Sequence, residues 1–556
     1  MERNMNILKN KFFIPMCVIF VIGLTVIQWM CNTRWEGDIE KDLVIRIRPD
    51  QIPRSYNPLM QFETKTLKMN EIGAAFSECV FEGLFNRVID KKKQPTYENG
   101  LAENIWSEDL LPMAKRWNVK LKSKSYWHGD TTSRITSSDV IHTYRCIEYG
   151  ASDSPWRGRL LRYLDEVPHS FHDDDLKIEF VFKRKLFVGD VKKLLTFKII
   201  PEAFKYDNKM VILTPENMPL DTDENWRIFN KICPIGSGPY IFDELKSGIN
   251  QIVLKKNPSY NNNLNIPRYV VFKEVNDDDL VSSIGKDFNM MLYTPNKYRT
   301  QIERVSNVKT YEYTPFYFYS IVFGKQLSID QKNQILCTID QDQKSEFLKH
   351  VGFPSANGRF INSGPFPWNW DVFDDSNPYE GKNYQCPKQN SKKTDITILF
   401  NKNDIRTEAI IIQISIALNQ YFNIKSLDMP EVDFMKKLRQ KSFDLALIIW
   451  EGFDQDYSIS KLYTEEENPM NLTFINFKKM KKLNSLFTRF SLEVRGKDRY
   501  KRGKKIHRFI TDEAPYLYLF TPPRRAAYLN SIRGIDNNPI HPETFLSNIK
   551  KWIIAQ

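Results

Sequence analysis

The residues best suited to chemistry lie between Trp450 and Tyr457, in the segment WEGFDQDY. Asp454 and Asp456 supply two carboxylates, and the two aromatic side chains are of the kind that line ligand pockets. Two nearby carboxylates can pair with a cationic ligand group, serve as acid and base in hydrolysis, or only shape a turn. The segment follows the apolar run 443–450, which is typical of a buried strand. Ligands of open α/β sheets bind beyond the carboxyl ends of strands, so this segment is the first candidate site.

Alternating strand and helix patterns precede that segment. Short apolar or extended runs at 396–400, 423–427 and 443–450 predict strands, and apolar residues at helical spacing over 407–420 predict a helix. This alternation predicts a parallel sheet with helices on its faces. Near the other end of the chain, residues 43–48 alternate apolar and polar side chains, which predicts a half-buried strand.

A hairpin is predicted over residues 235–260. Gly236, Gly238 and the proline after them form a tight entry, and a Lys-Ser-Gly turn separates two strands that close on Asn257 and Pro258.

Length and composition set limits on the class of protein. A chain of 556 residues exceeds what one hydrophobic core serves, so at least two lobes are expected. The net charge of +12 comes from short basic clusters scattered among acidic residues, which indicates solvated surfaces, and no nucleic-acid partner is expected. Seven cysteines without a CxxC spacing and seven scattered histidines predict neither zinc nor another cofactor, although one disulfide remains open.

The N-terminal segment, residues 1–32, contains an apolar run over 12–31 with basic residues before it. This length matches a membrane span, and the charges place residues 33–556 outside the cytoplasm. Bulky residues precede Cys31, which favours a retained anchor over a cleaved signal peptide, with lipidation at Cys31 as an alternative.

Several phrases occur together in the order found in one protein family. Residues 235–260 resemble the family's "GTGPY…G…L.RNP.Y", residues 81–85 (FEGLF) its "YEGL", residues 127–129 (WHG) its "FHDG", and residues 512–520 its "DEAPYIPLY". The family is that of extracytoplasmic solute-binding proteins, family 5, which serve peptide and nickel ABC importers. The resemblance spans nearly the whole exported part of the chain.

The resemblance implies an α/β fold of the two-lobed periplasmic-binding-protein type (type II) with an additional inserted small domain. Its expected division is a discontinuous lobe I over 42–88, 199–296 and 521–556, an inserted domain over 89–198, and lobe II over 297–520, after the anchor at 1–32.

The resemblance also implies roles for the residues at the candidate site. Peptide-binding relatives carry an aspartate three residues after the tryptophan, where it pairs with the ligand's α-ammonium; here that position is Phe453. Another branch reads "W…DPDPY", which Trp450, Asp454, Asp456 and Tyr457 follow more closely. Arg359 and Arg439 are candidates to bind a ligand carboxylate.

The expected function is capture of an oligopeptide or peptide-like ligand by a monomeric, membrane-tethered protein that delivers it to an ABC permease and catalyses nothing. Three alternatives stay open: a receptor of the same fold that acts as a sensor or surface interaction protein, a carrier of nickel, haem or an oligosaccharide, and a hydrolase that uses the two aspartates.

Overall fold

The computed structural model describes the chain from residue 37 to residue 555 with internal gaps. The residues left out are 1–36, 54, 61, 64–67, 70, 90–94, 108–112, 131, 151–154, 219–221, 261–264, 314–316, 325, 340, 351–392, 402–404, 452–476, 492–495, 514–515, 536–545, 547 and 556.

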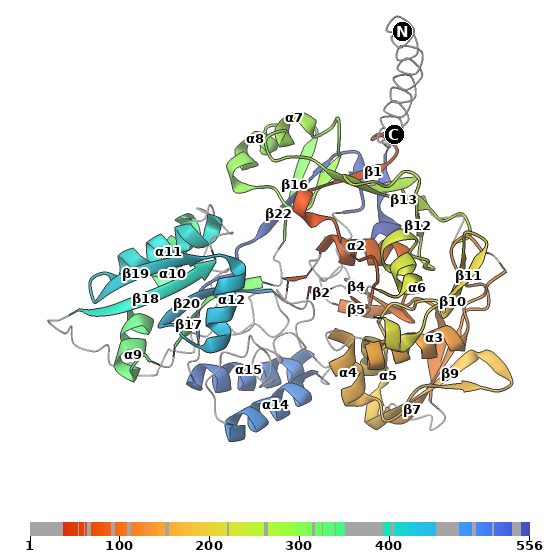
Figure 1. Cartoon of the computed structure of the whole chain (residues 1–556), viewed down its shortest axis with the longest axis horizontal. Helices are drawn as coiled ribbons and strands as arrows, with labels where there is room; N and C mark the ends of the chain where they lie inside the picture. Colours follow the sequence, from red (N-terminus) through yellow and green to blue (C-terminus); the bar gives the residue numbers. More distant parts are fainter. Residues whose placement is uncertain are drawn as a thin grey trace, which may run out of the picture.

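Two large sheets organise the described residues, one in each lobe (Figure 1). The lobe I sheet has seven strands in that part of the chain, in the spatial order β12 (Tyr240–Phe242), β13 (Gln251–Lys256), β14 (Tyr269–Glu274), β1 (Leu43–Ile47), β15 (Met290–Met291), β22 (Arg524–Leu529) and β16 (Val308–Tyr313). β12 and β13 are antiparallel, which confirms the predicted hairpin.

β1 lies at the centre of this sheet, parallel to both β14 and β15. The predicted strand is present, but the prediction that it is half-buried is wrong, because all five of its residues are buried. Arg46 tolerates this burial because its Nε donates to the Val275 carbonyl at 3.0 Å and its terminal nitrogen pairs with Asp277. Helices α7 (Leu280–Ser283) and α8 (Arg299–Glu303) contribute to the core on one face of the sheet.

A small domain lies beside lobe I, at the lower right of Figure 1. Its sheet has the order β6 (Ala102–Trp106), β7 (Met113–Leu121), β9 (Asp174–Phe187), β8 (His169–Phe171), and it carries α3 (Ser137–Arg145), α4 (Pro155–Tyr163) and α5 (Val188–Leu194). α3 begins after Thr136, where Asp139 Oδ2 accepts a hydrogen bond from the Thr136 amide at 3.0 Å and so caps the helix. Trp117 and Phe180 of this domain share one hydrophobic core with Phe76 of α2 (Glu71–Val80) in lobe I.

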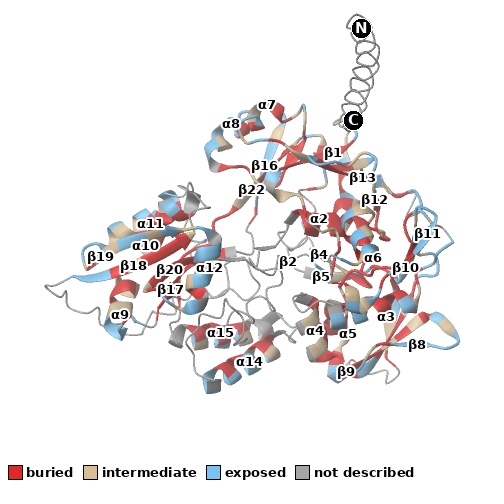
Figure 2. Ribbon diagram, in the orientation of Figure 1, coloured by how far each residue is buried: buried red, intermediate tan, exposed pale blue. Residues whose placement is uncertain are grey.

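The lobe II sheet has the order β19 (Phe422–Met429), β18 (Thr394–Asn401), β20 (Leu445–Glu451), β17 (Tyr317–Phe323), β21 (Tyr516–Tyr518). β18 is parallel to β19 and to β20, which confirms the parallel arrangement predicted for this region. α9 (Ile329–Thr338), α10 (Gln341–His350) and α11 (Ile405–Leu418) pack on one face; α12 (Glu431–Gln440), α14 (Phe477–Ser491) and α15 (Gly496–Glu513) pack on the other. Figure 2 shows β18, β20 and β17 largely buried between helices whose outer faces are exposed, whereas β19 at the edge of the sheet is mostly exposed.

Short elements complete the described fold. They are α6 (Glu224–Arg227) and the antiparallel pairs β2 (Phe62–Glu63) with β3 (Lys68–Met69), β4 (Phe85–Ile89) with β5 (Pro95–Asn99), β10 (Ala203–Tyr206) with β11 (Lys209–Ile212), and β23 (Ile532–Arg533) with β24 (Ile553–Ile554).

The chain passes between the two sheets at two places. It leaves lobe I after β16 and enters lobe II at β17, and it returns from β21 to β22 through residues 519–523. The boundary predicted at residue 297 therefore falls too early, because β16 lies beyond it yet pairs with β22 in the lobe I sheet.

The predicted anchor over 12–31 lies outside the described residues. Among the helices that are described, none combines the length and apolar composition needed to cross a membrane.

Candidate ligand-binding site

The two crossings bring the facing edges of the sheets close together. In lobe I, Tyr313 at the end of β16 is the register partner of Arg524 at the start of β22. In lobe II, Tyr317 at the start of β17 is the register partner of Glu451 at the end of β20. Four residue steps from Tyr313 to Tyr317 span at most about 14 Å. The end of β20 and the start of β22 therefore lie on opposite sides of one narrow boundary.

Trp450 belongs to this boundary through its backbone. It is the register partner of Phe318, the second residue of β17, and it lies at the carboxyl end of β20, which runs parallel to β18. The predicted position beyond the carboxyl ends of parallel strands is thus the edge of lobe II next to a crossing.

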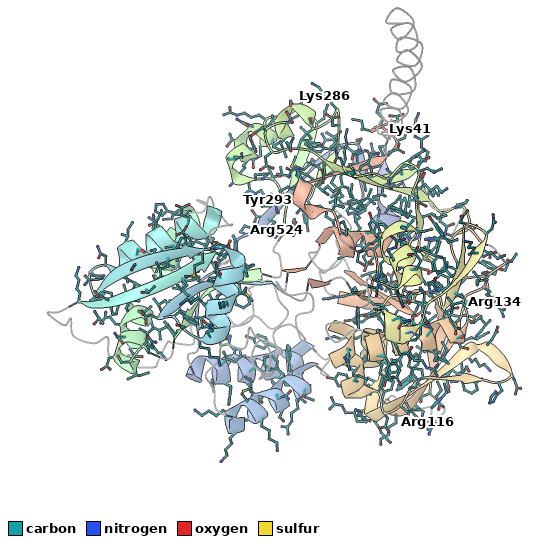
Figure 3. The ribbon with its side chains drawn as sticks, in the orientation of Figure 1. Lys41, Arg116, Arg134, Lys286, Tyr293 and Arg524 are labelled. Carbon is teal, nitrogen blue, oxygen red and sulfur yellow. The ribbon has the colours of Figure 1, made fainter. Side chains whose placement is uncertain are left out.

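The lobe I sheet also has carboxyl ends of parallel strands at the edge that faces lobe II. β1 and β15 are parallel neighbours, and Arg48 follows the last residue of β1, while Tyr293 and Thr294 follow β15. Figure 3 shows Tyr293 and Arg524 at the edge of lobe I that faces lobe II. These residues therefore occupy, in lobe I, the same kind of position that Trp450 occupies in lobe II.

Arg524 is the main charge at this edge. It is half-buried, and its guanidinium carbon lies 5.8 Å from the centre of the Tyr293 ring, within the range of a cation–π contact. Loss of water, and to a smaller extent the positive charge of Arg48, lowers the pKa of Arg524 to about 10. The group still carries its charge at neutral pH.

Thr294 adds a hydroxyl beside this charge. Its amide donates to the Arg525 carbonyl at 2.8 Å, which extends the pairing of β15 with β22. The residue is 5% exposed, and its Oγ1 has no hydrogen-bond partner among the described residues. A buried hydroxyl without a partner costs free energy, so such a group marks a place where a ligand or water can bind.

The site residues predicted from the sequence are described only in part. Trp450 and Arg439 are placed by backbone alone, the latter in α12, and nothing is described of their side chains. The other predicted site residues lie outside the described part of the chain: Arg359, Phe453, Asp454, Asp456 and Tyr457.

Sequence reasoning missed Arg48, Tyr293, Thr294 and Arg524. A usable signal was present for the last, because Pro522 and Pro523 precede an Arg-Arg pair that opens a strand. A double proline at the entry of a strand indicates a fixed crossing.

The glycines at the hairpin entry allow the backbone to pack directly against the end of α2. A Cβ on Gly236 would lie 2.0 Å from the Val80 carbonyl oxygen, at the end of α2. Between the two glycines sits His128 of the WHG phrase: its Nδ1 accepts from the Gly236 amide at 3.3 Å, and its Nε2 lies 3.1 Å from the Gly238 carbonyl. Burial lowers the pKa of His128 to about 4. The histidine is therefore neutral and structural.

Residues 81–85 (FEGLF) also contact residues 257–260 (NPSY), which close the predicted hairpin. Glu82 Oε1 accepts from Tyr260 at 2.5 Å and pairs with Lys550 Nζ at 2.8 Å, and Lys550 also donates to the Tyr260 oxygen. Burial alone would raise the pKa of Glu82, but the charge and hydrogen bonds of Lys550 and Tyr260 lower it overall. This buried triad joins the start, middle and end of the chain.

Within the described residues, no group of three or more His, Cys, Asp or Glu side chains could hold a metal ion. Cys79, Cys146 and Cys233 are free thiols, whereas Cys337 is disulfide-bonded to a cysteine outside the described part of the chain. The disulfide that composition left open is thus present.

Comparison with known proteins agrees with this architecture. The family model for the middle part of the bacterial extracellular solute-binding proteins, family 5, matches residues 96–332. The oligopeptide-binding protein AppA of Bacillus subtilis is 22% identical over 473 residues, which cover 79% of this chain and 81% of AppA.

Solved structures share the fold over most of the chain. The oligopeptide-binding protein AppA from Bacillus subtilis, solved in complex with a nonapeptide, matches with a TM-score of 0.64 at 17% identity, covering 93% of this chain and 99% of AppA. The ABC transporter substrate-binding protein CtaP from Listeria monocytogenes matches with a TM-score of 0.67 at 19% identity, covering 93% of this chain and 100% of CtaP. The fold is the two-lobed one of periplasmic binding proteins, and residues 96–332 within it match the family model of the bacterial extracellular solute-binding proteins, family 5.

Proposed function

We propose that this protein captures an oligopeptide or peptide-like ligand between its two lobes outside the cytoplasm and delivers it to an ABC importer. The observation that carries the proposal is that the chain passes between the two sheets twice, after β16 to β17 and after β21 to β22, beside the strand ends at which ligands bind in such sheets. The match of residues 96–332 to the model of a solute-binding family and the nonapeptide complex of the relative AppA support it.

Two crossings allow the lobes to rotate about a common hinge while each sheet stays intact. A ligand that contacts both edges stabilises the closed arrangement over the open one. The difference between its affinities for the two arrangements determines how far the equilibrium shifts toward the closed one. An extended peptide suits such a gap because its main chain offers hydrogen-bonding groups whatever its side chains are.

The lobe II contribution to this gap is proposed to be the segment after β20. Trp450 would form a wall of the gap, and the acidic groups beyond it would pair with a cationic ligand group. Arg359 and Arg439 are proposed partners for a ligand carboxylate. The full proposed set on this side is Trp450, Phe453, Asp454, Asp456, Tyr457, Arg359 and Arg439.

The apolar run over residues 12–31 is proposed to tether the protein to the outer face of the cytoplasmic membrane, by its length and by the basic residues before it. The disulfide at Cys337 supports an oxidising compartment, because such bonds are rare in the cytosol. The relatives are named as binding proteins. We propose that this protein binds its ligand as a monomer and catalyses no reaction.

The test uses residues 33–556, purified and freed of bound ligand by unfolding and refolding. Synthetic peptides of three to nine residues are screened by thermal unfolding; a ligand at 100 times its Kd stabilises by about 2.7 kcal/mol, which gives a clear rise in Tm. X-ray scattering with a binding peptide should show a smaller radius of gyration.

Trp450→Ala should weaken binding of the same peptide at least tenfold. Tyr149→Ala is the matched control, because Tyr149 is an aromatic side chain in the small domain with 57% exposure, and it should bind as the unaltered protein does. Failure of every peptide to raise the Tm or change the scattering would refute the proposed function.

A further inference from the structure

We propose that a basic face on helices α14 and α15 attracts ligands of net negative charge, so that acidic peptides are the ligands this protein captures fastest. This inference rests on the proposed function and adds to it the charge of the preferred ligand. The basic face is defined by six exposed side chains on the two helices: Lys478, Lys481, Lys482, Lys501, Lys505 and Arg508.

The first argument is the uneven distribution of charge along the chain. Residues 477–513, from the start of α14 to the end of α15, contain thirteen lysines and arginines and four acidic residues. They therefore contribute +9 of the net charge of +12. In the sequence these cations form separate short runs, and only the fold brings the runs together.

The second argument is the packing of the two helices. Leu483 of α14 and Ile506 of α15 lie in one hydrophobic cluster, so the apolar sides of both helices are buried in lobe II. Lys482 Nζ lies 5.5 Å from the centre of the Phe509 ring, which places the basic run of α14 next to that of α15. Figure 2 shows exposed residues along both helices.

The third argument is that these charges are not neutralised by the protein itself. None of the six residues of the basic face makes an ion pair within the described part of the chain, whereas Arg525 of lobe I pairs with Glu303 at 2.8 Å. Like charges four residues apart on a helix, such as Lys501 and Lys505, repel each other. An anion near the face is attracted by all six charges at once.

The fourth argument is position. The cluster that buries α14 and α15 also contains Phe318, the second residue of β17, and Tyr518, the last residue of β21. Their rings lie 5.8 Å apart, beside the two crossings. The core under the helices therefore extends to the boundary with lobe I. Because charges act over about 30 Å at low salt, the field of the basic face reaches a ligand that approaches this boundary.

Two observations favour a peptide over a larger partner. None of the exposed large apolar side chains in the described structure lies on α14 or α15, and lysine-rich surfaces without such side chains are not typical of protein interfaces. Lys41, close to the proposed tether, lies at the opposite end of the view from these helices (Figures 1 and 3). This placement disfavours the tethering membrane as the occupant of the face.

The test measures association and dissociation rate constants by stopped-flow fluorescence, on the full chain in an uncharged detergent. The probe is one labelled peptide that raises the Tm in the screen described above, made in two versions with Glu or Gln at the same two positions. At about 10 mM salt the Glu version should associate about tenfold faster than the Gln version. At about 1 M salt the two association rates should agree within about twofold, because charges are then screened within about 3 Å. The dissociation rates should change little, because steering by charges outside the contact surface acts on association.

The basic-face variant combines four substitutions: Lys478→Gln, Lys481→Gln, Lys501→Gln and Lys505→Gln. It should reduce the ratio of the two association rates at low salt to about twofold or less. The matched control removes the same charge from four exposed lysines of lobe I and the small domain: Lys124→Gln, Lys205→Gln, Lys209→Gln and Lys286→Gln. It should keep the ratio near about tenfold. The salt dependence of the unaltered protein tests the proposal even if a variant does not fold.

Each contrary outcome has a separate meaning. If peptides bind but the Glu and Gln versions associate at equal rates at low salt, or if both variants lose the ratio to the same extent, this inference is refuted while the proposed function stands. Equal rates, together with binding of the unaltered protein but not the basic-face variant to phosphatidylglycerol vesicles, would refute it in favour of a lipid surface. If no peptide binds at all, the proposed function is refuted and this inference falls with it.

Discussion

The buried triad of Glu82, Tyr260 and Lys550 allows a quantitative test of how the C-terminal end of the chain holds lobe I. The perturbation is Lys550→Met, which keeps most of the side-chain volume and removes the charge. The Glu82 side chain is 8% exposed and that of Lys550 28%, so the carboxylate would remain in a site that water scarcely reaches.

Breaking a buried ion pair by removing one partner costs about 3–5 kcal/mol, because a charge is left without compensation. Tyr260 still donates to Glu82 at 2.5 Å and offsets part of this loss. A hydrogen bond to a charged group contributes about 1.5–3 kcal/mol. We therefore expect Lys550→Met to lower the free energy of unfolding by about 2–3 kcal/mol.

The assay is equilibrium unfolding in urea at pH 7.5, followed by tryptophan fluorescence, on the ligand-free protein. Lys551→Met is the control: its Nζ lies 3.8 Å from Glu98 with both side chains well exposed, and exposed pairs contribute less than about 1 kcal/mol. Glu82→Gln combined with Lys550→Met should cost less than the sum of the single changes by at least about 1 kcal/mol.

Equal effects of Lys550→Met and Lys551→Met, or strict additivity in the double variant, would refute the reasoning. The pH dependence supplies a second check. Because the folded-state pKa of Glu82 lies below its ordinary value, its contribution is fully present above the unfolded pKa and is lost as the pH falls through the folded one.

Three further predictions concern the hairpin entry, its histidine and the disulfide. Gly238→Ala should destabilise the protein by at least about 2 kcal/mol in the same urea assay, because the new Cβ would lie 2.5 Å from the Cys79 carbonyl oxygen. Gly248→Ala is the control: its Cβ would meet nothing within 4 Å, so its effect should be near zero. Equal effects of the two substitutions would contradict this packing. The pKa of His128 is lowered from 6.5 to about 4, so as the pH falls the histidine is protonated in the unfolded chain before it is protonated in the folded protein. The free energy of unfolding should therefore fall by about 3 kcal/mol from this group between pH 6.5 and pH 4. His128→Gln should flatten this pH dependence, and an unchanged slope in the variant would refute the prediction. Cys337 should resist alkylation in unfolded, unreduced protein and react after reduction, and peptide mapping should identify its partner; reaction without reduction would refute the disulfide.

Local patterns were sufficient for the parts of the fold built from contiguous residues. The hairpin of β12 and β13 follows from turn residues and apolar alternation inside one short stretch, and the parallel units of lobe II follow from the alternation of strand and helix. The start of α3 is likewise a local feature, since Thr136 and Asp139 that cap it lie three residues apart.

Features that depend on distant residues could not be predicted in this way. The burial of Arg46 depends on Val275 and Asp277, more than two hundred residues away in the chain. The alternation around Arg46 signals an exposed face only if no such partner exists.

The candidate site shows the same limit. Arg524 is one of 80 lysines and arginines in the sequence, and only the strand register places it between the two crossings. The sequence pattern did lead to the edge of lobe II, since Trp450 ends β20, but it contained nothing that distinguished the lobe I edge.

The place of β22 between β15 and β16 has a consequence for how the protein is made. Both neighbours are synthesised before lobe II, and β22 only after it, so β16 has no strand to pair with in the lobe I sheet until synthesis is almost complete. Lobe II, by contrast, is continuous from β17 to β21. A chain emerging from its N-terminus would therefore finish its second lobe before its first, which keeps the first lobe's unpaired strand edge open longest to chaperones and to aggregation.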